Sequence, residues 1–285
     1  MNKSVTATLI IAGVAIATAY TLNGTNTTPE TSPEATSTPA ETPRQAATST
    51  EGGTQADSSS TPSDVFSDHD LHAAHIPDFA SIRDVKTKKQ TFFDYFEPIV
   101  EAENDRILAL RDDIERGLPD NRMSELCTRY RVNDECTPEA LLYKVDIIPT
   151  SMVLAQAAVE SAWGTSRFAQ QANNYFGQWC FTEGCGIVPS RRSSGAAHEV
   201  KMFDSPKQAV QAYFLNINSH PAYEPAREIR ASAYENDHVV VGSDMVGGLL
   251  SYSGIGEHYI EELRSIIRVN HLEEPNEVAQ NSGGH

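Results

Sequence analysis

Residues 153–177 read VLAQAAVESAWGTSRFAQQANNYFG, which combines a small-residue helix with one acid near its end. Apolar side chains recur at helical spacing on one face, and the pattern predicts a packed helix over residues 152–163. Gly164 follows the last turn, where a glycine commonly stops a helix in a left-handed conformation. The segment therefore raises the question of why Glu160 stands in the last turn of a buried helix.

The position of Glu160 predicts an unusual ionisation. A negative charge in the last turn faces the negative end of the helix dipole, which costs about 0.3–1 kcal/mol. Trp163 adds an apolar neighbour three residues further on. Both effects disfavour the charged form and predict a raised pKa, which is what a general acid needs near neutral pH. An exposed carboxyl without a function is the alternative.

Composition excludes one class of partner. The chain has 285 residues and a formal net charge of −17 at pH 7, and its basic residues form no long cluster. Proteins that bind nucleic acid neutralise phosphates with grouped lysine and arginine. We therefore expect no nucleic-acid partner, and the oligomeric state is not decided by the sequence.

The N-terminal part predicts export. Residues 1–22 contain one lysine and then an apolar run shorter than the roughly 20 residues of a membrane span. Ala17 and Ala19 have the small-residue spacing of a signal-peptidase site, so we expect a signal peptide or, alternatively, an N-terminal membrane anchor. Either one places the protein in the periplasm or the cell envelope.

The remaining domain boundaries follow from composition. Residues 23–66 are rich in serine, threonine and proline, cannot bury enough apolar surface to fold, and are interpreted as a disordered linker. Residues 67–273 are expected to form one domain, and residues 274–285 a flexible tail.

The four cysteines fall into two close pairs, Cys127 with Cys136 and Cys180 with Cys185. In an exported protein two local disulfides are the natural interpretation, although four cysteines allow three connectivities. A zinc site in which His198 or His220 joins the second pair is the alternative, but the cysteine spacing is loose for zinc. We expect no metal and no cofactor.

Helical periodicity dominates the domain. Helical patterns cover residues 91–118, 137–149, 205–220 and 256–270. Pro98 and Gly117 are expected to begin and end the first helix, and Thr137 and Ser205 to cap two others. Between residues 177 and 203 the helical period disappears, and HEVKMF alternates like a strand. The sequence predicts a mainly α (α+β) fold with a small β-hairpin lobe.

The segment after the acid carries a family resemblance. The matching positions are Glu160, Ser161, Trp163, Gly164, Ser166, Asn173, Asn174, Phe176 and Gly177. They resemble the signature of the glucosaminidase family of peptidoglycan hydrolases, and roughly residues 91–272 are similar to Bax-type exported proteins of Gram-negative bacteria. The resemblance implies a lysozyme-like helical domain that binds peptidoglycan glycan strands and cleaves the β-1,4 bond after N-acetylglucosamine.

The resemblance also implies roles for single residues. Glu160 matches the general acid of the family, and Tyr252 matches a tyrosine that lines its cleavage site. The spacing after this tyrosine departs slightly from the family pattern, so the roles of Tyr252 and Tyr259 are open to exchange.

A second catalytic group is harder to choose. Glycoside hydrolysis usually needs two carboxyls, one to donate a proton and one to activate water or attack the sugar. Glu199, in the expected strand, is the preferred candidate, ahead of Glu183 and Asp204. Substrate assistance, in which the acetamide group of the sugar attacks, is another solution.

The expected substrate-binding residues are Trp163, Asn174, Tyr175, Phe176 and Trp179. Flat aromatic faces suit sugar rings, but aromatic residues also pack and asparagine also forms turns. Arg191 and Arg192 could contact carboxylates of the peptide stems.

Two other functions fit the same residues. A lytic transglycosylase also uses a single glutamate followed by serine, and releases anhydro-muramic ends without using water. A non-catalytic wall-binding or assembly module would keep the cleft without turnover.

Overall fold

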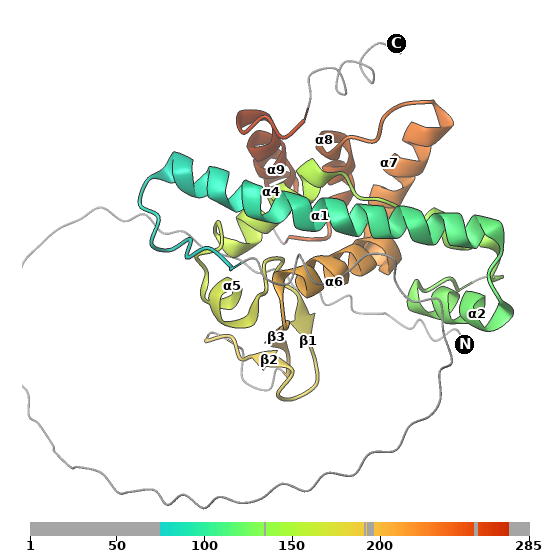
Figure 1. Ribbon diagram of the computed structural model, residues 1–285, viewed down its shortest axis with the longest axis horizontal. Helices are drawn as coiled ribbons and strands as arrows, with labels where there is room; N and C mark the ends of the chain where they lie inside the picture. The colour runs from blue at the N-terminus through green and yellow to red at the C-terminus, as the bar shows by residue number, and fades with distance from the viewer. Residues whose placement is uncertain (1–74, 134, 191, 193–196, 254–255, 274–285) are drawn as a thin grey trace, which may run out of the picture. The chain divides into compact units, whose positions relative to one another are not determined.

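The computed structural model describes residues 75–133, 135–190, 192, 197–253 and 256–273 (Figure 1). The expected signal peptide or anchor, the linker and the tail therefore lie outside the described residues. Within the described ranges, no helix is both long enough and apolar enough to cross a membrane.

The described chain is mainly helical. Its α-helices are α1 (Val85–Arg116), α2 (Asp120–Arg129), α3 (Pro138–Lys144), α4 (Thr150–Ser161), α5 (Arg167–Ala172), α6 (Pro206–Ser219), α7 (Glu224–Glu235), α8 (Gly242–Met245) and α9 (Glu257–Val269). Two 3₁₀-helices, η1 (Pro221–Tyr223) and η2 (Val246–Leu249), join the later ones. The predicted fold class is confirmed.

The β lobe is a small antiparallel sheet next to α5 (Figure 1). Its strands are β1 (Trp179–Cys180), β2 (Gly186–Ile187) and β3 (Glu199–Lys201), in the order β1-β3-β2. The lobe is thus more than the expected hairpin, because β3 pairs with both other strands: Trp179 lies opposite Val200, and Gly186 lies opposite Lys201.

Helix α1 begins earlier than predicted, because Asp84 caps it by accepting a hydrogen bond from the Thr87 amide. Pro98 was expected to start the helix but lies inside it, on the exposed side. A proline inside a helix costs about 3 kcal/mol or more. Burial of Phe92 and Phe96 in the preceding turns contributes about 1.5–3 kcal/mol each, which offsets that cost.

Helix α4 contacts α1, α8 and α9, which explains its small and apolar sequence. It ends at Ser161, two residues earlier than predicted, and the next three residues, Ala162, Trp163 and Gly164, have φ values of 50°, 58° and 74°. The Ser161 hydroxyl accepts a bond from the Gly164 amide (2.8 Å) and donates one to the Ala157 carbonyl (2.6 Å). The serine after the acid therefore holds a left-handed turn that otherwise costs about 1–2 kcal/mol per non-glycine residue.

The remaining sequence signals are largely confirmed. Thr137 and Ser205 cap α3 and α6 through their side chains, and Gly117 ends α1 with a φ of 95°. The cysteines form the two local disulfides, Cys127–Cys136 and Cys180–Cys185. The zinc alternative is wrong, because both sulfur atoms of the second pair are bonded to each other.

Candidate active site

A pocket of about 520 Å³ opens over the end of α4 and contains Glu160. Its walls come from α2 and the turn after it, from residues 176–181, and from α6 with the residues that follow it. Lys201 of β3, and Tyr252 and Ser253 before α9, complete the described lining. The pocket therefore collects residues that are far apart in the sequence around one carboxyl group.

Burial raises the pKa of Glu160 to about 7, and Glu262 adds a smaller effect in the same direction. The hydroxyl of Tyr259 donates a hydrogen bond to Oε1 of Glu160 (2.8 Å), which lowers the pKa in part. The predicted direction of the shift is confirmed. The expected contribution of Trp163 is not what the structure shows, because its ring packs against Phe93 of α1, at a centroid distance of 5.2 Å.

Glu160 is held by a chain of buried hydrogen bonds. The Tyr213 hydroxyl donates to Oε1 of Gln156, and Nε2 of Gln156 donates to the Tyr259 hydroxyl (2.9 Å). Because this amide occupies an acceptor position on Tyr259, the phenolic proton is directed at Glu160. Gln156 was not predicted as a site residue, although it stands four positions before Glu160 and so lies on the same helix face.

The second carboxylate oxygen of Glu160 lies beside Gly177. A Cβ atom on Gly177 would stand 3.2 Å from Oε2, and the φ of +63° also favours glycine here. Gly177 lines the pocket together with Glu160. Since Oε1 is bonded to the buried Tyr259, Oε2 is the oxygen available on the pocket side.

Tyrosines form one wall of the site. Tyr252 lines the pocket, and its hydroxyl donates to the Phe176 carbonyl (2.6 Å). Its ring stacks on that of Tyr259, with 5.8 Å between centroids and 4° between planes. The ring of Tyr223 also packs against that of Tyr252, with 5.7 Å between centroids. Of the two tyrosines left open by the sequence, Tyr252 thus faces the pocket and Tyr259 contacts the acid.

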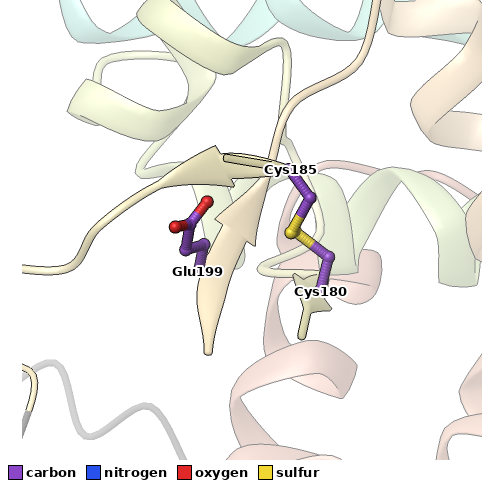
Figure 2. A group of neighbouring side chains, drawn as sticks. All are labelled: Cys180, Cys185 and Glu199. Carbon is purple, nitrogen blue, oxygen red and sulfur yellow. A yellow bond between two sulfur atoms is a disulfide. The ribbon is translucent and has the colours of Figure 1, made fainter. Parts of the chain in front are cut away.

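Glu199 lies outside the pocket lining, at the centre of the β lobe. Its side chain is 5% exposed, and its two oxygens accept bonds from the amides of Gly184 (3.1 Å) and Gly186 (2.9 Å). Figure 2 shows the carboxylate next to the Cys180–Cys185 disulfide. This group resembles a metal-ligand cluster in composition only, because the disulfide leaves no thiolate. Neither Glu183 nor Asp204 belongs to the described lining.

The four aromatic residues among the predicted substrate-binding residues divide into two groups. Phe176 and Trp179 line the pocket, and Trp179 stacks on His198 at 4.1 Å. Trp163 and Tyr175 are core aromatics that pack against α1.

Asn174 is buried and organises the turn that precedes the β lobe. Its Nδ2 donates to the carbonyls of Gln178 and Lys201, both at 2.8 Å, and its Oδ1 accepts from the amides of Phe176 and Gln178. Its contacts are therefore with the backbone around the site.

The two disulfides stand on different walls of the pocket. Cys127–Cys136 closes the segment that carries Arg129 and Arg131, and Cys180–Cys185 closes the turn that carries Phe181. These three lining residues were not predicted. Of the two arginines that were, Arg191 lies outside the described residues, and Arg192 donates to the His198 carbonyl outside the lining.

The chain is similar to one protein family and to individual known proteins. The family described as mannosyl-glycoprotein endo-beta-N-acetylglucosaminidase matches residues 139–272. Protein bax of Escherichia coli is 32% identical over 222 residues, which cover 72% of this chain and 78% of that protein. The catalytic domain of the autolysin Auto from Listeria monocytogenes matches with 18% identity and a TM-score of 0.39, covering 68% of this chain and 90% of that chain. The chain belongs to the glucosaminidase family, a family of glycoside hydrolases.

Proposed function

We propose that this protein cleaves the β-1,4 bond after N-acetylglucosamine in the glycan strands of peptidoglycan, with Glu160 as the general acid. One observation carries the proposal. A carboxyl group whose pKa is raised to about 7 lies in a pocket, with one oxygen bonded to a buried tyrosine and the other beside a glycine of the lining. A substantial fraction of such a carboxyl is protonated at neutral pH, as a general acid requires.

The hydrogen bonds of Glu160 indicate which of its two oxygens carries the transferable proton. Oε1 of Glu160 accepts the Tyr259 hydroxyl, so the transferable proton resides on Oε2. Oε2 gives this proton to the glycosidic oxygen as the bond to the anomeric carbon breaks, and Glu160 becomes a carboxylate. The Tyr259 hydrogen bond stabilises that carboxylate, which agrees with its lowering effect on the pKa.

The second group in this proposal is the substrate itself. Glu160 is the only carboxylate in the described lining, and both oxygens of Glu199 are occupied by backbone amides. We therefore assign Glu199 to holding the β lobe rather than to activating water. The acetamide oxygen of the sugar attacks the anomeric carbon as the glycosidic bond breaks, and a water molecule, losing a proton to the Glu160 carboxylate, then opens the resulting ring to give the reducing end, a route used by some glycoside hydrolases. Tyr252 and Trp179 place their rings against the bound sugars.

A lytic transglycosylase is the second candidate, and the single carboxylate in the described lining favours it. In that reaction the hydroxymethyl oxygen of muramic acid attacks its own anomeric carbon and forms an anhydro end. The two candidates leave different ends on the glycan, so the products distinguish them.

The test is mass spectrometry of purified peptidoglycan incubated with the full chain, wild type or Glu160→Gln. New reducing N-acetylglucosamine ends from wild type alone are the expected result. Anhydro-muramic ends would assign the protein to the transglycosylases. Binding of glycan without products from wild type would favour a non-catalytic wall-binding module.

The proposal includes the domain organisation. Residues 67–273 form the catalytic domain, residues 1–22 direct export as a signal peptide or anchor, residues 23–66 are a spacer, and residues 274–285 are a tail. The two disulfides support a place in the periplasm or cell envelope, because disulfides persist in oxidising compartments. Fractionation of cells that produce the full chain tests this location.

A further inference from the structure

The charge of the pocket differs in sign from that of the chain. The whole sequence carries a net charge of −17, yet the described lining contains Arg129, Arg131 and Lys201 and only one carboxylate. That carboxylate, Glu160, is partly protonated at neutral pH because its pKa is about 7. In the described lining the cationic side chains therefore outnumber the carboxylates, although the chain as a whole is acidic.

The backbone fixes where the two arginines stand. Arg129 is the last residue of α2, and Arg131 follows it with a φ of 54°. The turn is closed by bonds from the Arg131 amide to the Thr128 carbonyl (3.2 Å) and from the Val132 amide to the Cys127 carbonyl (2.9 Å). The Cys127–Cys136 disulfide spans the same segment. A left-handed backbone at a non-glycine residue is unfavourable, so this turn is held by its surroundings rather than by local preference.

The guanidinium groups are free to bind an anion. Neighbouring arginines in the same region are paired: Arg116 with Asp113, and Arg122 with Glu125. Across the described part of the chain, neither Arg129 nor Arg131 makes an ion pair with a carboxylate, and both are exposed. A guanidinium presents paired N–H donors that match the two oxygens of a carboxylate.

The position of Arg131 in the pocket is indicated by its effect on a neighbouring histidine. Burial lowers the pKa of His220, and the charge of Arg131 lowers it further. His220 lines the pocket on the α6 side. Arg131 therefore lies within electrostatic reach of the pocket wall that contains His220.

We propose that Arg129 and Arg131 form a carboxylate-binding subsite that distinguishes anionic peptidoglycan strands from neutral polymers of N-acetylglucosamine. The inference rests on the proposed function and adds the part of the substrate that is recognised. Every muramic residue carries a carboxylate, either in its attached peptide or, after removal of the peptide, on its lactyl group. A chitin-type chain has the same β-1,4 N-acetylglucosamine units without any carboxylate.

The experiment measures binding separately from turnover. The full chain with Glu160→Gln is titrated by calorimetry with three soluble oligomers of equal length. One carries peptides, one keeps only lactyl carboxylates, and one is the peptide-bearing oligomer with its carboxylates converted to amides. The same titrations are repeated with a protein that carries Arg129→Gln and Arg131→Gln together with Glu160→Gln. The control carries Arg116→Gln and Arg122→Gln, which remove the same two charges outside the pocket lining.

The proposal expects roughly tenfold tighter binding of a carboxylate-bearing oligomer than of the amidated one, in the range of charge-assisted hydrogen bonds. The Arg129→Gln and Arg131→Gln changes abolish this difference and leave the affinity for the amidated oligomer unchanged, whereas the control keeps it. Comparing the first two oligomers tells whether the peptide or the lactyl group supplies the carboxylate.

Equal affinity for all three oligomers would overturn the subsite while leaving the hydrolase proposal intact, provided that wild type releases products from peptidoglycan. An equal loss of affinity for all oligomers in the Arg129→Gln and Arg131→Gln protein would also overturn it, because the arginines would then only shape the pocket. Absence of both binding and products would refute the proposed function together with the subsite.

Discussion

The end of α4 and the centre of the β lobe each contain a glutamate, and the two side chains have different hydrogen-bond partners and different access to the pocket. Glu199 has both oxygens bonded to backbone amides and lies outside the pocket. Glu160 has one oxygen bonded to Tyr259 and the other beside Gly177 in the pocket lining. Burial alone therefore does not mark a catalytic acid.

The two glutamates differ in the number of hydrogen bonds that their carboxyl groups accept. The amides of Gly184 and Gly186 donate to the two oxygens of Glu199, and these two hydrogen bonds tie the turn at residues 184–186 to β3. At Glu160 burial outweighs the single bond from Tyr259, and the pKa rises to about 7. Glu199 thus links two parts of the β lobe, whereas Glu160 keeps a proton closer to neutral pH than an ordinary glutamate does.

The largest expected effect is on turnover. Glu160→Gln removes the proton donor but keeps an acceptor for Tyr259, so the release of glycan ends should fall by roughly 100- to 10,000-fold. Rates are measured by mass spectrometry on peptidoglycan at pH 6, with circular dichroism to check folding. Glu262→Gln, a nearby acid without a place in the described lining, serves as the control and should keep activity within a few-fold.

Gly177→Ala tests whether turnover depends on the position of Oε2 of Glu160, the oxygen beside Gly177. The added Cβ would lie 3.2 Å from Oε2 and displace it, so turnover should fall by roughly tenfold or more, as small misplacements of reacting groups do. Gly117→Ala is the matched control, since Gly117 also has a positive φ but has no atom within 4 Å of an added Cβ. Comparable losses of turnover in both variants would indicate backbone strain instead of contact with the acid.

Stability should change with opposite signs at the two glutamates. The pKa of Glu160 is raised from 4.5 to about 7, so the folded state keeps a proton that the unfolded state releases, and stability falls as the pH rises between these values. Glu160→Gln should therefore stabilise the protein above pH 7, by up to about 3 kcal/mol. Glu199→Gln should destabilise it by about 1–3 kcal/mol, because one amide N–H then faces an NH₂ group.

Denaturant unfolding at pH 8 measures both changes in the free energy of unfolding. Glu183→Gln, in the same turn as the amides that bind Glu199 but exposed, should shift stability by less than about 0.5 kcal/mol. A loss of turnover in folded Glu199→Gln as large as that in Glu160→Gln would contradict the assignment of separate roles.

The smallest expected effect is on the pH profile. A general acid works when protonated, so kcat/KM should fall as the pH rises through the pKa of Glu160. Tyr259→Phe removes the hydrogen bond that lowers this pKa, and the descending limb should move to higher pH by up to about one unit. Tyr252→Phe is the control, because its hydroxyl bonds to the Phe176 carbonyl. If the descending limb of the kcat/KM profile stayed at the same pH in Tyr259→Phe, the hydrogen bond from Tyr259 would not control the pKa of Glu160.

Local signals in the sequence predicted much of the fold. Caps such as Thr137 and Ser205 act within four residues, and the cysteines of each disulfide are close neighbours in the chain. The prediction that Pro98 begins the first helix was wrong. The helix continues through the proline because its aromatic residues are buried, and this burial depends on the packing of α1 against α4 and α6. Local rules describe the cost of the proline but not the tertiary contacts that offset it.

Fewer residues of the candidate site could be predicted from local signals in the sequence. Glu160 breaks a helix-dipole rule, and this made it visible in the sequence. Tyr259, which contacts it, lies 99 residues away, and Arg129 reaches the pocket from a different helix. Trp163 and Tyr175 carry the composition of a sugar-binding surface but pack on α1, since periodicity does not say which side of a motif faces solvent.

The most direct test of the central claim is an NMR titration of the full chain labelled with ¹³C at the glutamate side-chain carboxyls. The account predicts one carboxyl resonance, missing in Glu160→Gln, that titrates near pH 7 with the same midpoint as the descending limb of kcat/KM. A midpoint for Glu160 near the ordinary value of 4.5, or a limb that does not follow it, would contradict the account.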